Sequence, residues 1–149
     1  MTELNQLILN FGLKKNFDKH DYYVSKSNFF AFNIIDKWPK WEKKFVNIFG
    51  DTFSGKSHLA NIFKSKSNGL LIKSEEFTDD TLKQSKLHDT IIIDNFKNNI
   101  DENLLYSLFN LIDQDNKYLL LTSREAVNKM KFKLPDMFSR AKNCLFAEI

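Results

Sequence analysis

The sequence of 149 residues predicts an α/β fold in which a five-stranded parallel sheet lies between helices. Five short apolar runs alternate with segments of helical period, and this alternation is typical of parallel sheets with right-handed crossovers. Most of the runs are continuously apolar, which indicates strands that are covered on both faces. The five runs are Phe45–Phe49, Leu70–Ile72, Thr90–Ile93, Tyr118–Leu121 and Leu145–Ile149.

The first regular element is a predicted helix over residues 28–38, ahead of the first strand. Phe29, Phe32 and Ile35 belong to its broad apolar face, and Ser27 is a candidate cap at its beginning. The Trp38-Pro39 step should end it, because a residue that precedes proline avoids the helical region.

Two further helices are predicted between the strands. One follows Lys56, with apolar residues at i, i+3 and i+4, and the other follows Asp101, which is a plausible cap for an apolar stripe of leucine, phenylalanine and isoleucine. The segment 75–89 is polar, so we expect it to be only partly helical.

Composition excludes several classes of protein. The charge of +3 is too small to indicate a nucleic-acid surface by itself, so DNA contact is expected to be weak or indirect. No apolar run approaches the ~18 residues that a membrane span needs. The single cysteine, Cys144, excludes an internal disulfide and suits the cytoplasm. The three histidines have no metal-ligand spacing. The length predicts one domain over 17–149, preceded by a tail over 1–16.

The strongest motif is a phosphate-binding loop between the first strand and the helix after it. It reads G-D-T-F-S-G-K-S and matches G-x-x-x-x-G-K-[ST] at every fixed position. Its backbone amides would surround a phosphate, Lys56 would reach the β- and γ-phosphates, and the Ser57 hydroxyl would hold Mg²⁺. The nucleotide-binding residues expected here are Gly50, Asp51, Thr52, Phe53, Ser54, Gly55, Lys56, Ser57 and His58.

The third apolar run supplies the second half of such a site. It ends in Asp94, a carboxylate that would hold Mg²⁺ at the carboxyl end of the sheet, where the ligands of α/β proteins gather. Many ATPases place a second acid next, but here the residue is Asn95. An amide can orient water but cannot accept its proton, so we expect ATP or ADP binding with slow or negligible turnover.

Over nearly its whole length the chain resembles the DnaA group of AAA+ ATPases, and within that group the regulators of the Hda type. GDTFSGKSHLA and the pair Asp94-Asn95 are similar to sequences in these proteins, as is LPDMFSR at residues 134–140. The resemblance implies an AAA+ (RecA-like) base subdomain that stimulates hydrolysis of DnaA-bound ATP and so limits replication initiation. DnaA would be its partner, and the oligomeric state of the chain, a homo-oligomer included, is left open.

The resemblance also implies roles for single residues. Arg140 would be an arginine finger that acts in trans on ATP held by a neighbouring subunit, although a surface arginine in an ion pair is the alternative. Thr122 or Ser123 would be the polar sensor 1 residue near the γ-phosphate. Residues near the adenine would be Tyr23, Val24 and Asn28.

The tail carries a second hint about partners. Gln6-Leu7-Ile8-Leu9-Asn10-Phe11 fits Q-L-x-L-x-F, a pattern similar to peptides that dock on the DNA polymerase sliding clamp (β subunit). Gln6 would be the polar anchor, while Leu7, Leu9 and Phe11 would fill apolar pockets.

The chain departs from the resembled proteins after its last strand. A full relative carries a helical lid with a second sensor arginine, and this sequence shows neither after Arg140, so we expect a fragment or a shortened relative. Two other functions compete with the regulatory one. One is an initiator or loader that assembles on DNA, and the other is a P-loop kinase of small molecules. The scarcity of basic stripes and of arginines disfavours them.

Overall fold

The computed structural model describes residues 23–149 and confirms the predicted α/β architecture. A five-stranded parallel sheet has the strand order β2-β3-β4-β1-β5. The elements, in chain order, are α2 (Phe29–Lys37), β1 (Phe45–Phe49), α3 (Lys56–Ser67), β2 (Leu70–Lys73), the 3-10 turn η2 (Ser74–Glu76), α4 (Asp79–Ser85), β3 (Thr90–Phe96), α5 (Glu102–Gln114), β4 (Tyr118–Ser123), the 3-10 turn η3 (Val127–Lys129), α6 (Pro135–Lys142) and β5 (Leu145–Glu148).

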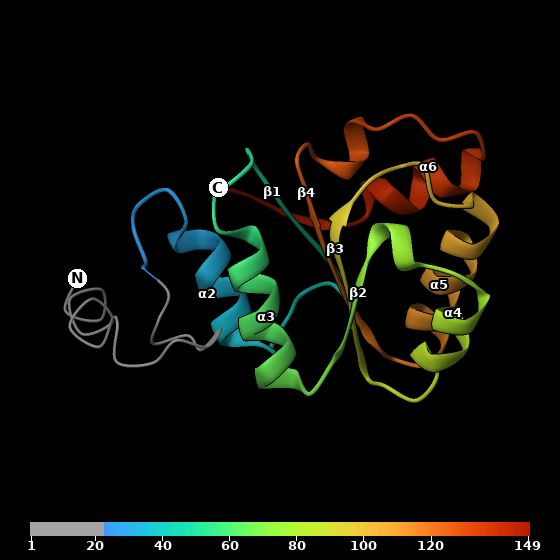
Figure 1. Cartoon of the computed structure of the whole chain (residues 1–149), viewed down its shortest axis with the longest axis horizontal. Coiled ribbons are helices and arrows are strands. Elements are labelled where there is room, and N and C mark those ends of the chain that lie inside the picture. The colour runs from blue at the N-terminus through green and yellow to red at the C-terminus, as the bar shows by residue number, and fades with distance from the viewer. Residues whose placement is uncertain (1–22) are drawn as a thin grey trace.

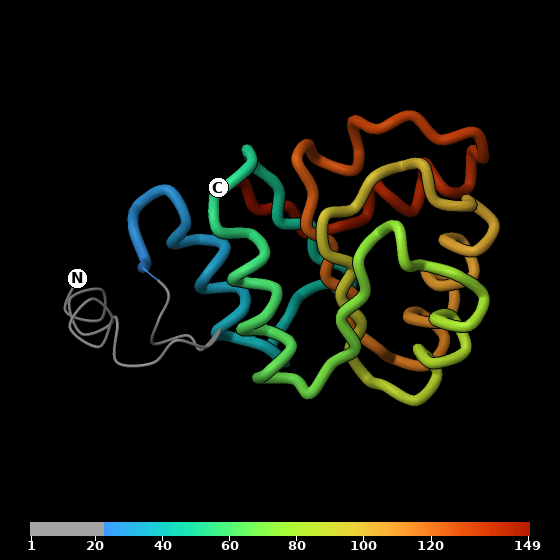
Figure 2. Tube along the Cα trace, viewed as in Figure 1, coloured from blue at the N-terminus to red at the C-terminus, as the bar shows by residue number. Residues whose placement is uncertain are grey.

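Helices cover both faces of the sheet. Figure 1 shows α2 and α3 on one side and α4, α5 and α6 on the other. Figure 2 follows the chain from α3, through β2, across to α4 on the opposite side. The helices α2 and α3 pack side by side and begin at the same end of the sheet (Figure 1).

The core therefore consists of two apolar layers, one on each face of the sheet. Consecutive residues of a strand point to opposite faces, so Ile91 and Ile93 join the layer under α5 and α6, while Ile92 joins the layer under α2 and α3. Leu119 and Leu120 of β4 divide in the same way. This two-sided burial explains why the strands are continuously apolar.

Most predicted boundaries agree with the structure to within three residues. Asp101 caps α5 as expected, because its carboxylate accepts hydrogen bonds from the amides of Asn103 (2.9 Å) and Leu104 (3.4 Å). The prediction for Ser27 is wrong: α2 begins after Asn28, whose side chain gives no cap to the helix. The Asn28 amide instead bonds the backbone of Tyr23 and Ser25, and so closes the turn that leads into the helix.

No helix in the described residues, 23–149, is long and apolar enough to cross a membrane.

Candidate nucleotide-binding site

The loop between β1 and α3 has the backbone that the phosphate-binding motif requires. Gly55 takes a φ of 95°, a left-handed conformation that side chains disfavour. A Cβ on Gly50 would lie 2.6 Å from the carbonyl oxygen of Ile149, so the close approach of this residue, which follows β5, excludes a side chain there. Phe53 is also left-handed, with a φ of 65°, and its side chain is fully exposed. The structure thus explains both fixed glycines of the motif, Gly50 by the lack of space for a side chain and Gly55 by its backbone conformation.

Lys56, the first residue of α3, reaches back over this loop. Its Nζ donates to the carbonyl oxygens of Gly50 and Asp51, each at 2.6 Å, and to the Ser54 hydroxyl at 3.2 Å. Partial burial lowers the pKa of the ammonium, although the carboxylates of Asp51 and Asp94 oppose that shift. A bound phosphate would replace these neutral acceptors of the ammonium with anionic ones.

A hydrogen-bonded cluster joins α3, β3 and β4 beside the loop. Asp94 is buried, and its Oδ2 accepts from the Ser57 hydroxyl at 2.9 Å while its Oδ1 accepts from the Thr122 hydroxyl at 2.5 Å. The Asp94 carboxylate and the Ser57 hydroxyl are hard oxygen ligands of the kind that Mg²⁺ prefers. Mg²⁺ in phosphate sites is usually held by one or two such protein oxygens, with phosphates and waters completing the shell. Ser57 and Asp94 therefore fit the predicted metal ligands.

Asn95 follows Asp94 at an irregularity of the sheet. The pairing of β3 with β4 shifts register between Ile93 and Phe96, and Asn95 takes a φ of 56°. Its backbone amide donates to the Thr122 Oγ1 at 2.8 Å, and the residue itself is exposed. The bulge thus turns the side chain that replaces a second acid out of the ladder and toward solvent.

A cavity of about 690 Å³ connects these groups. Ten of the predicted residues line it: Thr52, Phe53, Ser54, Gly55, Lys56, Ser57, His58, Asp94, Asn95 and Thr122. Sequence analysis did not place the remaining five there, which are Lys73, Glu75, Phe96, Lys97 and Arg124. Lys73 ends β2 and pairs in register with Asp94 of β3, so its place in the cavity follows from which strands are neighbours in the sheet.

Thr122 and Ser123, the two candidates for sensor 1, are consecutive residues of β4, so their side chains point to opposite faces of the sheet. The Thr122 side chain faces Asp94 and the cavity. Ser123 faces away, where its hydroxyl donates to the carbonyl oxygen of Glu125 at 2.6 Å and accepts from the Asn47 amide at 2.9 Å. Of the two residues, Thr122 lines the cavity and Ser123 does not.

Three residues expected near the adenine do not line this cavity. Val24 is buried in the apolar layer with α2 and α3, and the Asn28 side chain is used in its own turn. Tyr23 is about half exposed. The turn that contains them precedes α2, which begins at the same end of the sheet as α3 (Figure 1).

Arg140 lies on α6, on the opposite face of the sheet from α3 (Figure 1). Its guanidinium donates to the Asn110 Oδ1 at 2.5 Å and pairs with the Asp113 carboxylate at 3.5 Å. It also lies 5.6 Å from the centre of the Tyr106 ring. All three partners are on α5. The arginine thus forms the surface ion pair that was the alternative to the finger, and it is not brought together with the phosphate loop of its own chain.

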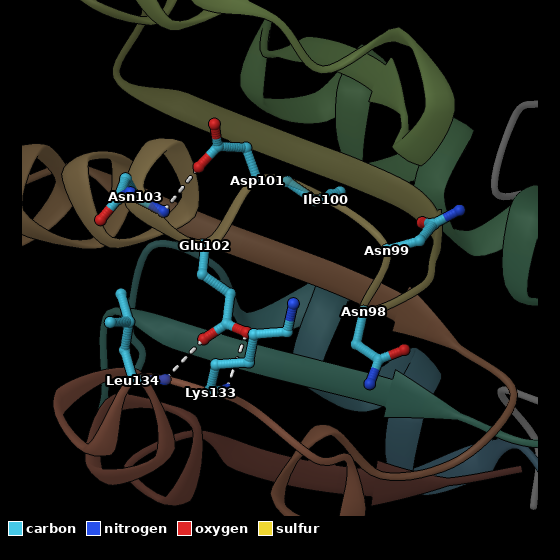
Figure 3. Close-up of a pocket in the computed structure, with 8 residues that line it drawn as sticks. All are labelled: Asn98, Asn99, Ile100, Asp101, Glu102, Asn103, Lys133 and Leu134. Atoms are coloured by element: carbon cyan, nitrogen blue, oxygen red, sulfur yellow. Dashed lines mark hydrogen bonds between the residues drawn. The ribbon is translucent and has the colours of Figure 1, made fainter.

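A second hollow, of about 380 Å³, lies between the loop after β3 and the segment before α6. Figure 3 shows Glu102 extending across it toward Lys133 and Leu134. The Glu102 carboxylate accepts hydrogen bonds from both of these backbone amides, at 2.8 and 2.9 Å. Because Leu134 immediately precedes α6, Glu102 anchors the helix that carries Arg140.

Two further points concern the tail motif and a metal site built from protein ligands alone. The clamp-binding pattern of Gln6, Leu7, Leu9 and Phe11 lies outside the described residues. Within residues 23–149, no group of three or more His, Cys, Asp or Glu side chains could hold a metal ion by itself.

The fold resembles several solved structures. AMPPCP-bound DnaA from Aquifex aeolicus superposes with a TM-score of 0.79 at 15% identity, over 93% of this chain and 51% of that one. Domain III of Thermotoga maritima DnaA gives 0.69 at 18% identity, over 89% and 66%. A putative primosome component from Streptococcus pyogenes gives 0.67 at 15% identity, over 84% and 80%.

The chain has the fold of an AAA+ P-loop NTPase. At these identities the likeness establishes the fold alone, and the chain spans about half the length of the DnaA structure from A. aeolicus. No family model matches the sequence, and neither does any curated protein. The phosphate loop follows β1, which lies between β4 and β5 in the sheet.

Proposed function

We propose that this chain is a nucleotide-binding AAA+ protein of DNA replication that binds ATP or ADP with Mg²⁺. The observation that carries the proposal is the convergence of the phosphate loop, Lys56 and the Ser57–Asp94–Thr122 cluster on one cavity. The fold shared with AMPPCP-bound DnaA supports it, because that protein holds its nucleotide on the same architecture. In this assignment the loop amides and Lys56 bind the phosphates, while Ser57 and Asp94 hold the metal.

Titration calorimetry with Mg-ADP and Mg-AMPPCP tests the binding proposal. We expect Lys56→Ala to abolish measurable binding. Lys64→Ala removes the same charge from an exposed position near the end of α3 and should leave the affinity unchanged. Equal affinities of the two variants would contradict the proposal.

The finer role that we propose is stimulation of ATP hydrolysis on DnaA by a clamp-tethered chain. The position of Arg140 on the face opposite its own phosphate loop supports action on a neighbouring subunit. The planar guanidinium would stabilise charge on the transferring phosphoryl group, an effect worth about 10³–10⁵ in rate in well-studied fingers. Asn95 stands where many ATPases have a second acid, and because its amide cannot accept a proton from water, we expect the chain itself to hydrolyse ATP only weakly.

The decisive assay measures DnaA-ATP hydrolysis with the clamp loaded on DNA, in the presence and absence of this chain. Arg140→Ala should abolish stimulation, and Lys129→Ala should preserve it. Stimulation by Arg140→Ala at the wild-type level would eliminate the finger assignment.

Clamp tethering requires its own test. The double variant Gln6→Ala and Leu7→Ala should remove pull-down by the clamp. Asn5→Ala with Asn10→Ala, which lie outside the fixed positions of the pattern, should retain it. Retained pull-down by the first pair would overturn the assignment of the tail.

An initiator or loader that assembles on DNA is the second candidate. The match to this chain covers 80% of the putative primosome component but only 51% of the DnaA chain. The greater agreement in length with a primosome component is the observation that favours this candidate. Steeply salt-dependent DNA binding by the purified chain would favour it, and its absence would favour the regulator.

A further inference from the structure

The chain contains only two arginines among its 22 basic residues, and their environments differ. Arg140 is held by three side chains of α5. Arg124 follows β4, lines the nucleotide cavity and is exposed to solvent, and among residues 23–149 it has no hydrogen bond or ion pair. A cavity wall that carries an unpaired guanidinium is suited to an anion.

The backbone that carries Arg124 is firmly placed. Asn47 is fully buried in β1, an inner strand of the sheet, and its amide donates to the Leu121 carbonyl oxygen at 3.1 Å and to the Ser123 hydroxyl at 2.9 Å. Its oxygen accepts from the Val127 amide at 2.9 Å. The side chain thus bonds both sides of the 123–127 turn. Arg124 therefore projects from a fixed position, with only its own side chain left to adjust.

The location of Arg124 distinguishes it from the other cations of the cavity. It lies two residues beyond Thr122, which is bonded to the proposed metal ligand Asp94. Lys56 and Arg124 line the same cavity. Lys56 reaches the β- and γ-phosphates in this kind of site, so a second cation on the cavity wall is available to the terminal phosphate.

We propose that Arg124 binds the terminal phosphate of the nucleotide in its own chain and makes the cavity favour a nucleoside triphosphate over a diphosphate. This inference rests on the proposed nucleotide binding. A guanidinium offers two parallel N–H donors to a phosphate, which lysine cannot do, and this chain otherwise uses lysine almost throughout. A diphosphate leaves that position empty, so loss of the arginine should affect the two ligands unequally.

The test compares Mg-AMPPCP with Mg-ADP by titration calorimetry on the full chain. We expect Arg124→Ala to weaken Mg-AMPPCP binding about tenfold or more and Mg-ADP binding by less than about threefold. Arg124→Lys should recover part of the loss, because it keeps the charge without the fork. Lys129→Ala, which removes an exposed charge a few residues further along, is the matched control and should change neither affinity.

The outcomes separate the two proposals. If Arg124→Ala weakens both ligands equally, or weakens neither, the inference is overturned while nucleotide binding stands. If the wild-type chain binds neither ligand, the proposed function fails and this inference fails with it. Retained Mg-ADP binding by Arg124→Ala shows in the same experiment that the variant is folded.

Discussion

Asp94 uses its two carboxylate oxygens for two hydroxyls that come from different elements. Ser57, on α3, is exposed, so a metal ion could lie between its hydroxyl and the Asp94 carboxylate and take the place of their direct hydrogen bond. Thr122 is fully buried, and its hydroxyl both donates to Asp94 and accepts from the Asn95 amide. Thr122 therefore links Asp94, the proposed metal ligand, to Asn95 through hydrogen bonds.

Thr122→Val should therefore be costly although the two side chains have the same shape. The change leaves a buried carboxylate oxygen and a backbone amide without their partner, which should lower the free energy of unfolding by about 1–3 kcal/mol. Urea unfolding measures this, and Thr122→Ser, which keeps the hydroxyl, should lose less. A valine variant as stable as the wild type would show that water or a rearranged Asn95 replaces the bond.

The pKa of Lys56 gives the site a pH dependence. Burial lowers it from the value in the unfolded chain, and Arg124 adds to that shift. Between the two pKa values the unfolded state binds more protons, so the free energy of unfolding should rise with pH in that window. Phosphates would raise the pKa again on binding, and nucleotide binding would then take up a proton.

We therefore expect the affinity for Mg-ADP to fall as pH rises through the pKa of Lys56 in the nucleotide-free chain. Lys56→Arg, which stays charged, should show a weaker fall over the same range. Calorimetry in two buffers of different ionisation enthalpy would measure the proton uptake. An uptake of zero at every alkaline pH would contradict the shift.

Among the elements, α6 depends on a contact made by another helix. Glu102 begins α5, and its carboxylate accepts from the amides of Lys133 and Leu134 just before α6 begins (Figure 3). Such bonds to a charged acceptor are stronger than neutral ones. The position of Arg140 thus depends on Glu102 as well as on its own contacts with α5.

Glu102→Ala should release the start of α6 without unfolding the sheet. Hydrogen exchange of the amides at 133–138 should become at least about tenfold faster, while the amides of β1 and β3 should keep their protection. Glu125→Ala, an exposed acid that lies away from this contact, is the control. Unchanged exchange at 133–138 would mean that the packing of Met137 and the contacts of Arg140 with α5 hold the helix without Glu102.

The sequence predicted all five strands and the helices α2, α3 and α5, because two-sided burial and helical periodicity are local patterns, but it did not predict the short helix α6. It also predicted the phosphate loop and Asp94, because a motif and a strand end are both local. The contributions of Lys73, Lys97 and Arg124 to the cavity depend on which strands become neighbours, and the sequence contains no spacing that states this. The bond between Glu102 and the start of α6 is likewise a contact across some thirty residues.

At the scale of the whole molecule, the sheet joins two layers that carry different parts of the proposed function. The phosphate loop leads into α3, which covers one face of the sheet, and Arg140 lies on α6, which covers the other face. Cys144 is the one cysteine of the chain, it is buried in the layer that contains Met137 and Ala141, and burial raises the pKa of its thiol to about 12. A buried thiol that is not ionised near neutral pH reacts only when its surroundings open.

Labelling of Cys144 therefore reports whether the two faces unfold together. In native conditions at pH 8 a disulfide reagent should label it far more slowly than in urea, since the thiolate is both scarce and covered. If opening is global, Mg-ADP bound on the other face should slow labelling by a factor of about 100 at a ligand concentration 100 times Kd. A rate that stays constant under saturating Mg-ADP would mean that α6 and β5 open without α3, in which case the helix that carries Arg140 moves independently of the proposed nucleotide site. The first result would make the sheet a rigid link, so that a nucleotide at the loop stabilises the surface that presents Arg140 to a neighbour.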